Sequence, residues 1–67
     1  MQQMIMNGTI YDKSLKEMIL NVCTKAYGEV QSIQKKGVIE IHYFENNINL
    51  TFEDRNNICF YRIHRNR

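Results

Sequence analysis

The sequence predicts an α+β fold in which one helix packs on one face of a three- to four-stranded antiparallel meander sheet. Apolar residues first recur with the 3.6-residue period of a helix and then switch to the two-residue period of strands. The chain has 67 residues, contains no proline and shows no internal repeat, so one domain is expected. We predict an arm or extra edge strand at 1–11, a helix at 14–27, an antiparallel sheet at 29–64 and a basic tail at 65–67.

The predicted helix has recognisable signals at both ends. Ser14 and Glu17 fit a capping box, and Asp12 is a competing N-cap. Gly28 is placed to end the helix in the left-handed conformation. The apolar residues at helical spacing form one stripe that is expected to face the sheet: Leu15, Met18, Ile19, Val22, Cys23 and Ala26.

Four strands are expected after the helix, at 29–34, 38–44, 48–53 and 58–64, with turn residues between them. A two-residue turn at Asn46 and Asn47 and a four-residue loop at 54–57 place apolar residues together on one face, without any slip of register. The core face predicted in this way consists of Val30, Ile39, Ile41, Tyr43, Ile48, Leu50, Phe52, Cys59, Tyr61 and Ile63.

The same register turns a second set of side chains outward, and this set is the candidate binding surface. Two aromatic residues beside Arg and His are more than scattered surface apolars, and aromatics with Arg dominate protein-binding hot spots. The predicted partner-binding residues are Phe44, Phe60, Arg62, His64 and His42. As alternatives, the N-terminal arm covers this face, or two copies of the chain pair through it.

The basic end of the chain suggests an alternative function. Formal net charge is only +2, but Arg62, Arg65 and Arg67 lie within the last six residues. Aromatic side chains on an open sheet beside such cations can stack single-stranded bases and contact phosphates. Arg65 and Arg67 are therefore the candidate nucleic-acid contacts, although the aromatic signature of RNA-binding sheets is absent.

The sequence offers no catalytic or metal-binding constellation, so no enzyme activity, cofactor or metal is predicted. Cys23, Cys59, His42 and His64 lack the close ligand pairs of a structural zinc site. The predicted faces also point the cysteines away from the histidines. Both cysteines are expected to be reduced thiols.

Composition and charge suggest where the protein works. No apolar run is long enough for a membrane span, and the first residues lack the features of a signal peptide, so a cytoplasmic protein without a membrane partner is expected. Abundant isoleucine, asparagine and lysine suggest the AT-rich genome of a low-GC bacterium, its viruses or mobile elements. We therefore expect a non-enzymatic regulator or inhibitor, for example an anti-defence protein, that binds a host protein or forms a homodimer.

Overall fold

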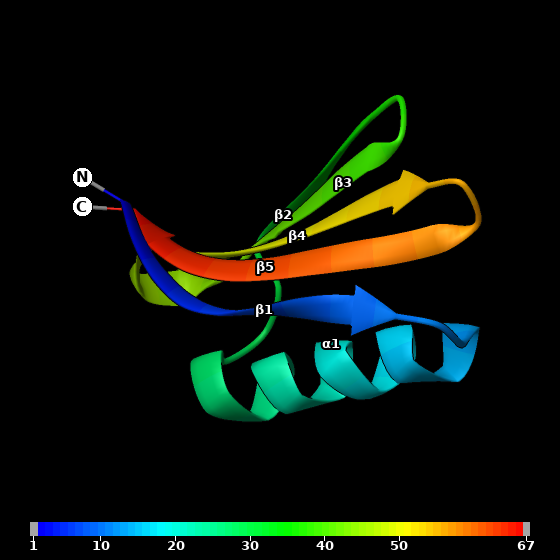
Figure 1. The fold of residues 1–67 in the computed structure, drawn as a ribbon. Coiled ribbons are helices and arrows are strands. Elements are labelled where there is room, and N and C mark those ends of the chain that lie inside the picture. Colours follow the sequence, from blue (N-terminus) through cyan, green and yellow to red (C-terminus); the bar gives the residue numbers. More distant parts are fainter. Residues whose placement is uncertain (1, 67) are drawn as a thin grey trace.

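A computed structural model describes residues 2–66 and confirms the predicted fold class, one helix with an antiparallel sheet (Figure 1). The sheet has five strands in the order β1-β5-β4-β3-β2. The N-terminal segment is an edge strand that pairs with β5, so this alternative is confirmed over a plain arm. The elements are β1 (Gln2–Ile10), α1 (Lys13–Tyr27), β2 (Ser32–Lys36), β3 (Ile39–Tyr43), β4 (Ile48–Arg55) and β5 (Ile58–Asn66), with a short 3₁₀ turn at Glu45–Asn47.

Helix α1 begins one residue before its predicted start because Asp12, and not Ser14, is the N-cap. The Asp12 carboxylate accepts a hydrogen bond from the backbone N–H of Ser14 at 3.1 Å, which satisfies one of the orphan donors of the first turn. At the other end Gly28 has φ +89° and ψ −169°, a glycine conformation outside the predicted left-handed helical region.

The helix is also rotated from its predicted orientation. The side chains that pack on or near the core come from Ile19, Leu20, Cys23 and Tyr27, and Cys23 is fully buried. Four members of the predicted stripe are exposed instead: Leu15, Met18, Val22 and Ala26. The apolar arc of this helix is wider than the sheet covers, and the part of it that is buried lies on the same side as Lys16, which contacts Glu40 of β3.

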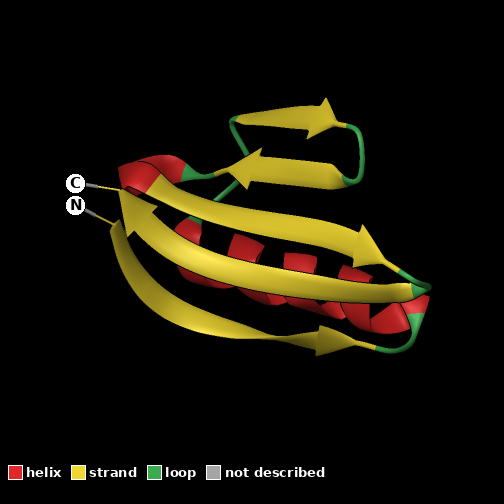
Figure 2. Cartoon of the chain, turned by 45° about the horizontal axis from the view of Figure 1, so that its top comes forward, coloured by secondary structure: helices red, strands yellow, loops and turns green. Residues whose placement is uncertain are grey.

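The helix covers one side of the sheet, here called the helix face, and leaves the other side, here called the open face, without a layer over it (Figure 2). The hairpin of β2 and β3 extends beyond the helix, and β2 is exposed throughout. The core lies between α1 and the helix face and consists of Ile10, Cys23, Phe44, Ile48, Leu50, Phe52 and Ile63. The side chains on the open face are those of Asn7, Thr9, Ile39, Ile41, Tyr43, Asn49, Thr51, Glu53, Phe60, Arg62 and His64. Among them Asn49 and Thr51, on the central strand β4, are buried between their neighbours.

The predicted register of β3 is wrong by one residue, and this error exchanges its two faces. Glu45–Asn47 forms a three-residue turn that is closed by a 2.8 Å hydrogen bond from the N–H of Phe44 to the carbonyl of Ile48. The extra residue moves Leu50 from its predicted partner Tyr43 to His42. Because paired residues share a face, Phe44, His42 and Glu40 turn toward the helix, while Ile39, Ile41 and Tyr43 turn to the open face.

Two other hairpins differ from prediction with smaller effects. Between β4 and β5 the turn contains only Asn56 and Asn57, both at positive φ, so Phe52 lies opposite Tyr61 and not Cys59. A shift of two residues keeps every side chain on its predicted face. Strand β2 begins at Ser32, so Val30 lies outside the sheet and is exposed, contrary to its predicted core position.

Residues 2–66 include no helix that combines the length and the apolar character needed to cross a bilayer.

Candidate functional site

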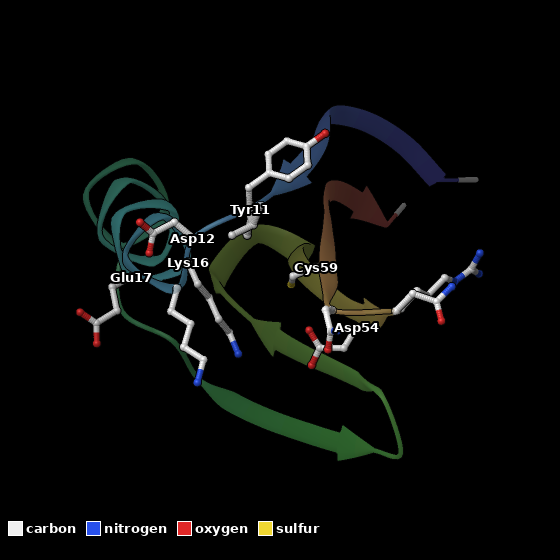
Figure 3. A pocket seen from close by; sticks show the side chains of 11 residues that line it. Tyr11, Asp12, Lys16, Glu17, Asp54 and Cys59 are labelled. Atoms are coloured by element: carbon white, nitrogen blue, oxygen red, sulfur yellow. The ribbon is translucent and has the colours of Figure 1, made fainter.

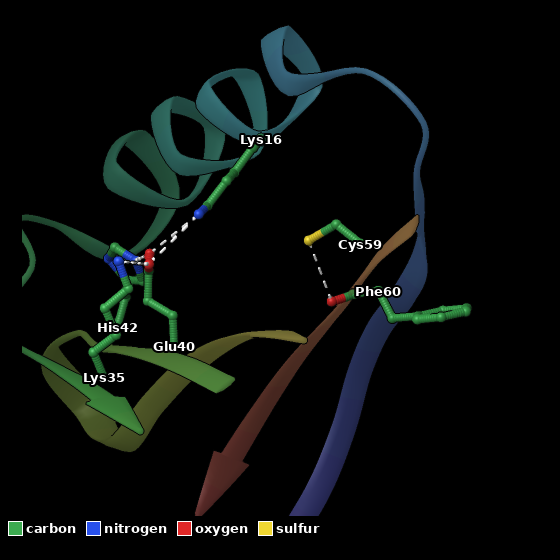
Figure 4. A network of polar contacts seen from close by, with 6 residues as sticks. All are labelled: Lys16, Lys35, Glu40, His42, Cys59 and Phe60. Carbon is green, nitrogen blue, oxygen red and sulfur yellow. Dashed lines mark hydrogen bonds and ion pairs between the residues drawn. The ribbon is translucent and has the colours of Figure 1, made fainter. Parts of the chain in front are cut away.

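The open face carries an exposed aromatic side chain on β5, the strand next to edge strand β1. Phe60 lies on β5 opposite Thr9 of β1 and Glu53 of β4, and 40% of it is accessible to solvent. Figure 4 shows its ring pointing away from the helix, on the opposite side of the strand from Cys59. A shallow hollow of about 310 Å³ adjoins the ring and is lined by Asn7, Gly8, Thr9, Glu53, Arg55, Phe60, Tyr61 and Arg62. An apolar anchor beside a small hollow is the kind of surface that binds a complementary side chain.

Two arginines share one carboxylate beside this ring. The Nε of Arg55 donates to Oε2 of Glu53, and Nη2 of Arg62 lies 3.7 Å from Oε1 of the same carboxylate. About half of the Arg62 side chain is exposed. Such an exposed pair adds little to stability, about 0–1 kcal/mol, so its main effect is to hold the Arg62 guanidinium near Phe60 with donors left over for a partner.

His64 continues the open face next to Arg62 but does not add a cation at neutral pH. Burial lowers the pKa of its imidazole, and the nearby charge of Arg62 lowers this pKa further. The ring therefore stays neutral at neutral pH and can both donate and accept hydrogen bonds.

The predicted partner-binding residues divide between the two faces. Phe60, Arg62 and His64 lie together on the open face, as expected. The outward placement of Phe44 and His42 is wrong, since each is only 5% exposed.

Both of these residues pack in the core. The ring of Phe44 packs edge-on against Tyr27 at a centroid distance of 6.4 Å, and His42 packs edge-on against Phe52 at 5.6 Å. Neither can contact a partner without unfolding of the surrounding core.

Three residues missed by the sequence-based prediction replace them on the open face: Ile39, Ile41 and Tyr43. The Tyr43 hydroxyl donates to Oε1 of Gln34 on β2 at 2.9 Å, which orients the ring along the sheet. The run from Val38 to Phe44 has apolar residues on both faces, so only the three consecutive turn-forming residues at 45–47 signalled the change of face.

Of the two candidate nucleic-acid contacts, the one that the structure describes, Arg65, is not grouped with Phe60. Arg65 lies opposite Ile48 and Gln3, which places it on the helix face, while Arg62 and His64 face the other way. Arg67 lies outside the described residues. A strand of nucleic acid that stacked on Phe60 would therefore meet Arg62 and Arg55, with Glu53 between them.

A partly buried polar network lies on the helix face under α1 (Figure 4). Glu40 accepts from His42 and from Nζ of Lys16 at 3.5 Å, and Nζ of Lys35 lies 3.7 Å away. The hydrogen bond from His42 lowers the pKa of Glu40 against the opposing effect of burial, and the charge of Lys16 lowers it further. Lys16 also lies over the ring of Phe52, 4.9 Å from its centroid. The contact of Lys16 with Glu40 holds the helix against β3.

A larger hollow, of about 750 Å³, lies between the start of α1 and the β4–β5 turn (Figure 3). Its lining includes Lys16, Asp54 and Cys59, but neither Glu40 nor His42. Burial raises the pKa of the Cys59 thiol, and Asp54 raises it further, so the sulfur is a protonated and weak nucleophile. Cys59 is therefore not activated for nucleophilic attack in this hollow.

Cys23 and Cys59 are both free thiols, and burial raises the pKa of Cys23 as well. Within residues 2–66, no three His, Cys, Asp or Glu side chains gather closely enough to hold a metal ion. The open face around Phe60 is the better candidate site.

No protein-family model, curated protein or solved structure matches this chain. Its function has to be inferred from the chemistry of its own surfaces.

Proposed function

We propose that this chain is a non-enzymatic protein-binding regulator or inhibitor that acts through the open face of its sheet. The observation that carries the proposal is the solvent-exposed ring of Phe60 next to the hollow and to the half-exposed guanidinium of Arg62. An apolar anchor beside a planar fork of donors matches a protein surface that offers an apolar side chain and a carboxylate or carbonyl. In this proposal the protein acts in the cytoplasm of a low-GC bacterium, and it is encoded by that bacterium, by one of its viruses or by a mobile element.

The composition of the open face supports a protein partner. Ile39, Ile41 and Tyr43 extend the apolar area across β3, and His64 adds a neutral donor and acceptor. Aromatic residues and arginine, which this surface combines, are enriched in protein interfaces.

The test compares Phe60→Ala and Arg62→Ala with Val38→Ala, a truncation at an exposed apolar residue in the β2–β3 turn. Each protein is used to capture partners from host lysate treated with nuclease, and the affinity for the captured protein is then measured. We expect Phe60→Ala and Arg62→Ala each to weaken binding by more than about 1 kcal/mol, roughly fivefold or more. Val38→Ala should bind as the wild type does. Equal affinity of all four proteins would rule out the open face.

The alternative function is a nucleic-acid-binding module, supported by Phe60 between two arginines on an uncovered sheet. Its signature is a steep loss of affinity for a single-stranded oligonucleotide as salt is raised. Arg62→Ala and Arg55→Ala would then each flatten the salt dependence by about one phosphate contact. Binding that survives nuclease and is insensitive to salt favours the protein partner.

A further inference from the structure

Edge strand β1 lacks charged side chains. None of the nine residues Gln2–Ile10 is charged, and Met4, Ile5 and Met6 are exposed, with 54% of Met6 accessible to solvent. Edge strands of monomeric proteins usually carry lysine or proline, because their free N–H and C=O groups can pair with another strand. One register shift between Met4 and Met6 is the only irregularity of β1 in its pairing with β5.

The opposite edge of the sheet is protected. Strand β2 carries Lys35 and Lys36, and two copies of this strand lying side by side would bring like charges together. The two edges therefore differ in charge, and β1 is the edge at which self-pairing meets no repulsion.

An exposed apolar flank of α1 lies on the same side of the molecule as β1. Leu15, Met18 and Val22 are spaced three and four residues apart, and Met18 and Val22 are 57% and 58% exposed. Successive helical residues are about 100° apart around the axis, so this flank and the flank of Glu17 lie on opposite sides of the buried Cys23. Figure 3 shows Glu17 on the side of the helix that is turned away from β1, so the flank of Leu15, Met18 and Val22 lies on the side of β1.

We propose that two copies of this chain form a dimer by antiparallel pairing of β1 with β1 around a two-fold axis. Antiparallel neighbours in a sheet are related by an axis normal to the sheet, so both helices come to lie on the same side of the seam. Their Leu15, Met18 and Val22 flanks then face each other above Met6 of both strands. A single two-fold axis thus buries both uncharged surfaces, the edge strand β1 and the flank of Leu15, Met18 and Val22.

A second copy fits this surface better than an unrelated charged segment does. Neither β1 nor the three flank residues offers a charge to pair with a partner's charge, so a charged strand would be desolvated without compensation. Because the β2 edge is closed to self-pairing by its lysines, the association stops at two subunits and does not continue into a fibre.

The dimer also has a consequence for the open face. Pairing of β1 with β1 joins the two sheets into one, with both helices on one side and both open faces on the other. The dimer therefore presents two copies of the Phe60 surface in the same direction, and this arrangement does not depend on what that surface binds.

The first test is the mass of the protein by light scattering from low to high micromolar concentration. We expect twice the protomer mass of 8.1 kDa for the wild type. Val22→Lys and Met6→Lys each place a charge in the seam and should weaken dimerisation at least tenfold, while circular dichroism stays unchanged. If Met6→Lys fails to fold, Val22→Lys decides, because Val22 is exposed in the protomer.

The matched controls are Ile33→Lys and Phe60→Lys, which introduce the same charge at exposed apolar positions on β2 and on the open face. Both should remain dimeric. Amide hydrogen exchange of β1 should be slow in the wild type and fast in Val22→Lys. A wild type that is monomeric throughout, a dimer that survives Val22→Lys, or a dimer lost in Phe60→Lys would each overturn the proposal.

Discussion

Gly8 lies opposite Tyr61 across the β1–β5 pair, and the tyrosine ring occupies the space beside the glycine where a side chain would lie. A Cβ at Gly8 would be 2.7 Å from Cε1 of Tyr61 and 2.9 Å from its hydroxyl oxygen. Glycine weakens a strand because it buries no side chain, and an aromatic ring laid over it replaces the missing contact. The contact between Gly8 and Tyr61 therefore helps to hold edge strand β1 against β5.

The first prediction is that Gly8→Ala destabilises the protein by about 1–3 kcal/mol, although alanine is ordinarily the better strand residue, because the ring must move aside. Urea denaturation measures the change. Adding Tyr61→Leu to Gly8→Ala should recover part of the loss, since the smaller side chain leaves room for the methyl group. Unchanged stability of Gly8→Ala would show that the ring does not cover the strand.

The second prediction separates the observed register from the one that the sequence favoured. Leu50 is fully buried, so Leu50→Ala should cost about 2–5 kcal/mol, which is enough to unfold a chain of this size. Ile41 lies on the open face and is only partly buried, so Ile41→Ala should cost clearly less. The two urea midpoints decide the matter, and equal losses would contradict the orientation of β3 described above.

The third prediction concerns acid stability. The pKa of Glu40 is lower in the folded protein than in the unfolded chain, so ionisation of Glu40 stabilises the fold above the ordinary pKa of a glutamate. This contribution is lost as the pH falls through the lowered folded pKa. Glu40→Gln should therefore destabilise the protein at neutral pH by about 1–3 kcal/mol and make its melting temperature less sensitive to acid. Glu29→Gln, at an exposed position outside the network, is the matched control and should keep the wild-type profile.

The fourth prediction concerns milder acid. The pKa of His64 is lower in the folded protein than in the unfolded chain, so below neutral pH the unfolded chain takes up the proton first. Stability should fall as the pH drops through the ordinary histidine pKa, and the fall should stop below the folded pKa. The NMR titration of the His64 ring should have its midpoint below that of a free imidazole, and His64→Gln should remove this part of the pH dependence. A midpoint above the free value would contradict the placement of the ring.

The orientation of a strand could be predicted from the sequence where one of its faces is apolar and the other is polar. Ile48, Leu50 and Phe52 alternate with Asn49, Thr51 and Glu53, and only one orientation of β4 buries the first set. The orientation of β5 followed for the same reason, and with it the placement of Phe60, Arg62 and His64 on one face.

The orientation of β3 could not be predicted in this way. Both of its faces carry apolar groups, so its orientation depended on whether the turn before Ile48 contains two residues or three. The rotation of α1 could not be predicted from the local pattern either, because the apolar residues of the helix extend around more of its circumference than the sheet covers, and contacts such as Lys16 with Glu40 join residues 24 positions apart. Half of the candidate site was therefore predictable, and the half contributed by β3 was not.

The pairing of the first strand with the last has a kinetic consequence. Every hydrogen-bonded neighbour of β1 belongs to β5, so the strand nearest the N-terminus has no partner until the far end of the domain is in place. Closing so long a loop carries a large entropic cost, and contacts between distant segments form slowly. The hairpins among β2, β3, β4 and β5 need only short loops and can assemble earlier. Docking of β1 is thus expected to be the last step of folding, and until it occurs β5 is itself an unpaired edge.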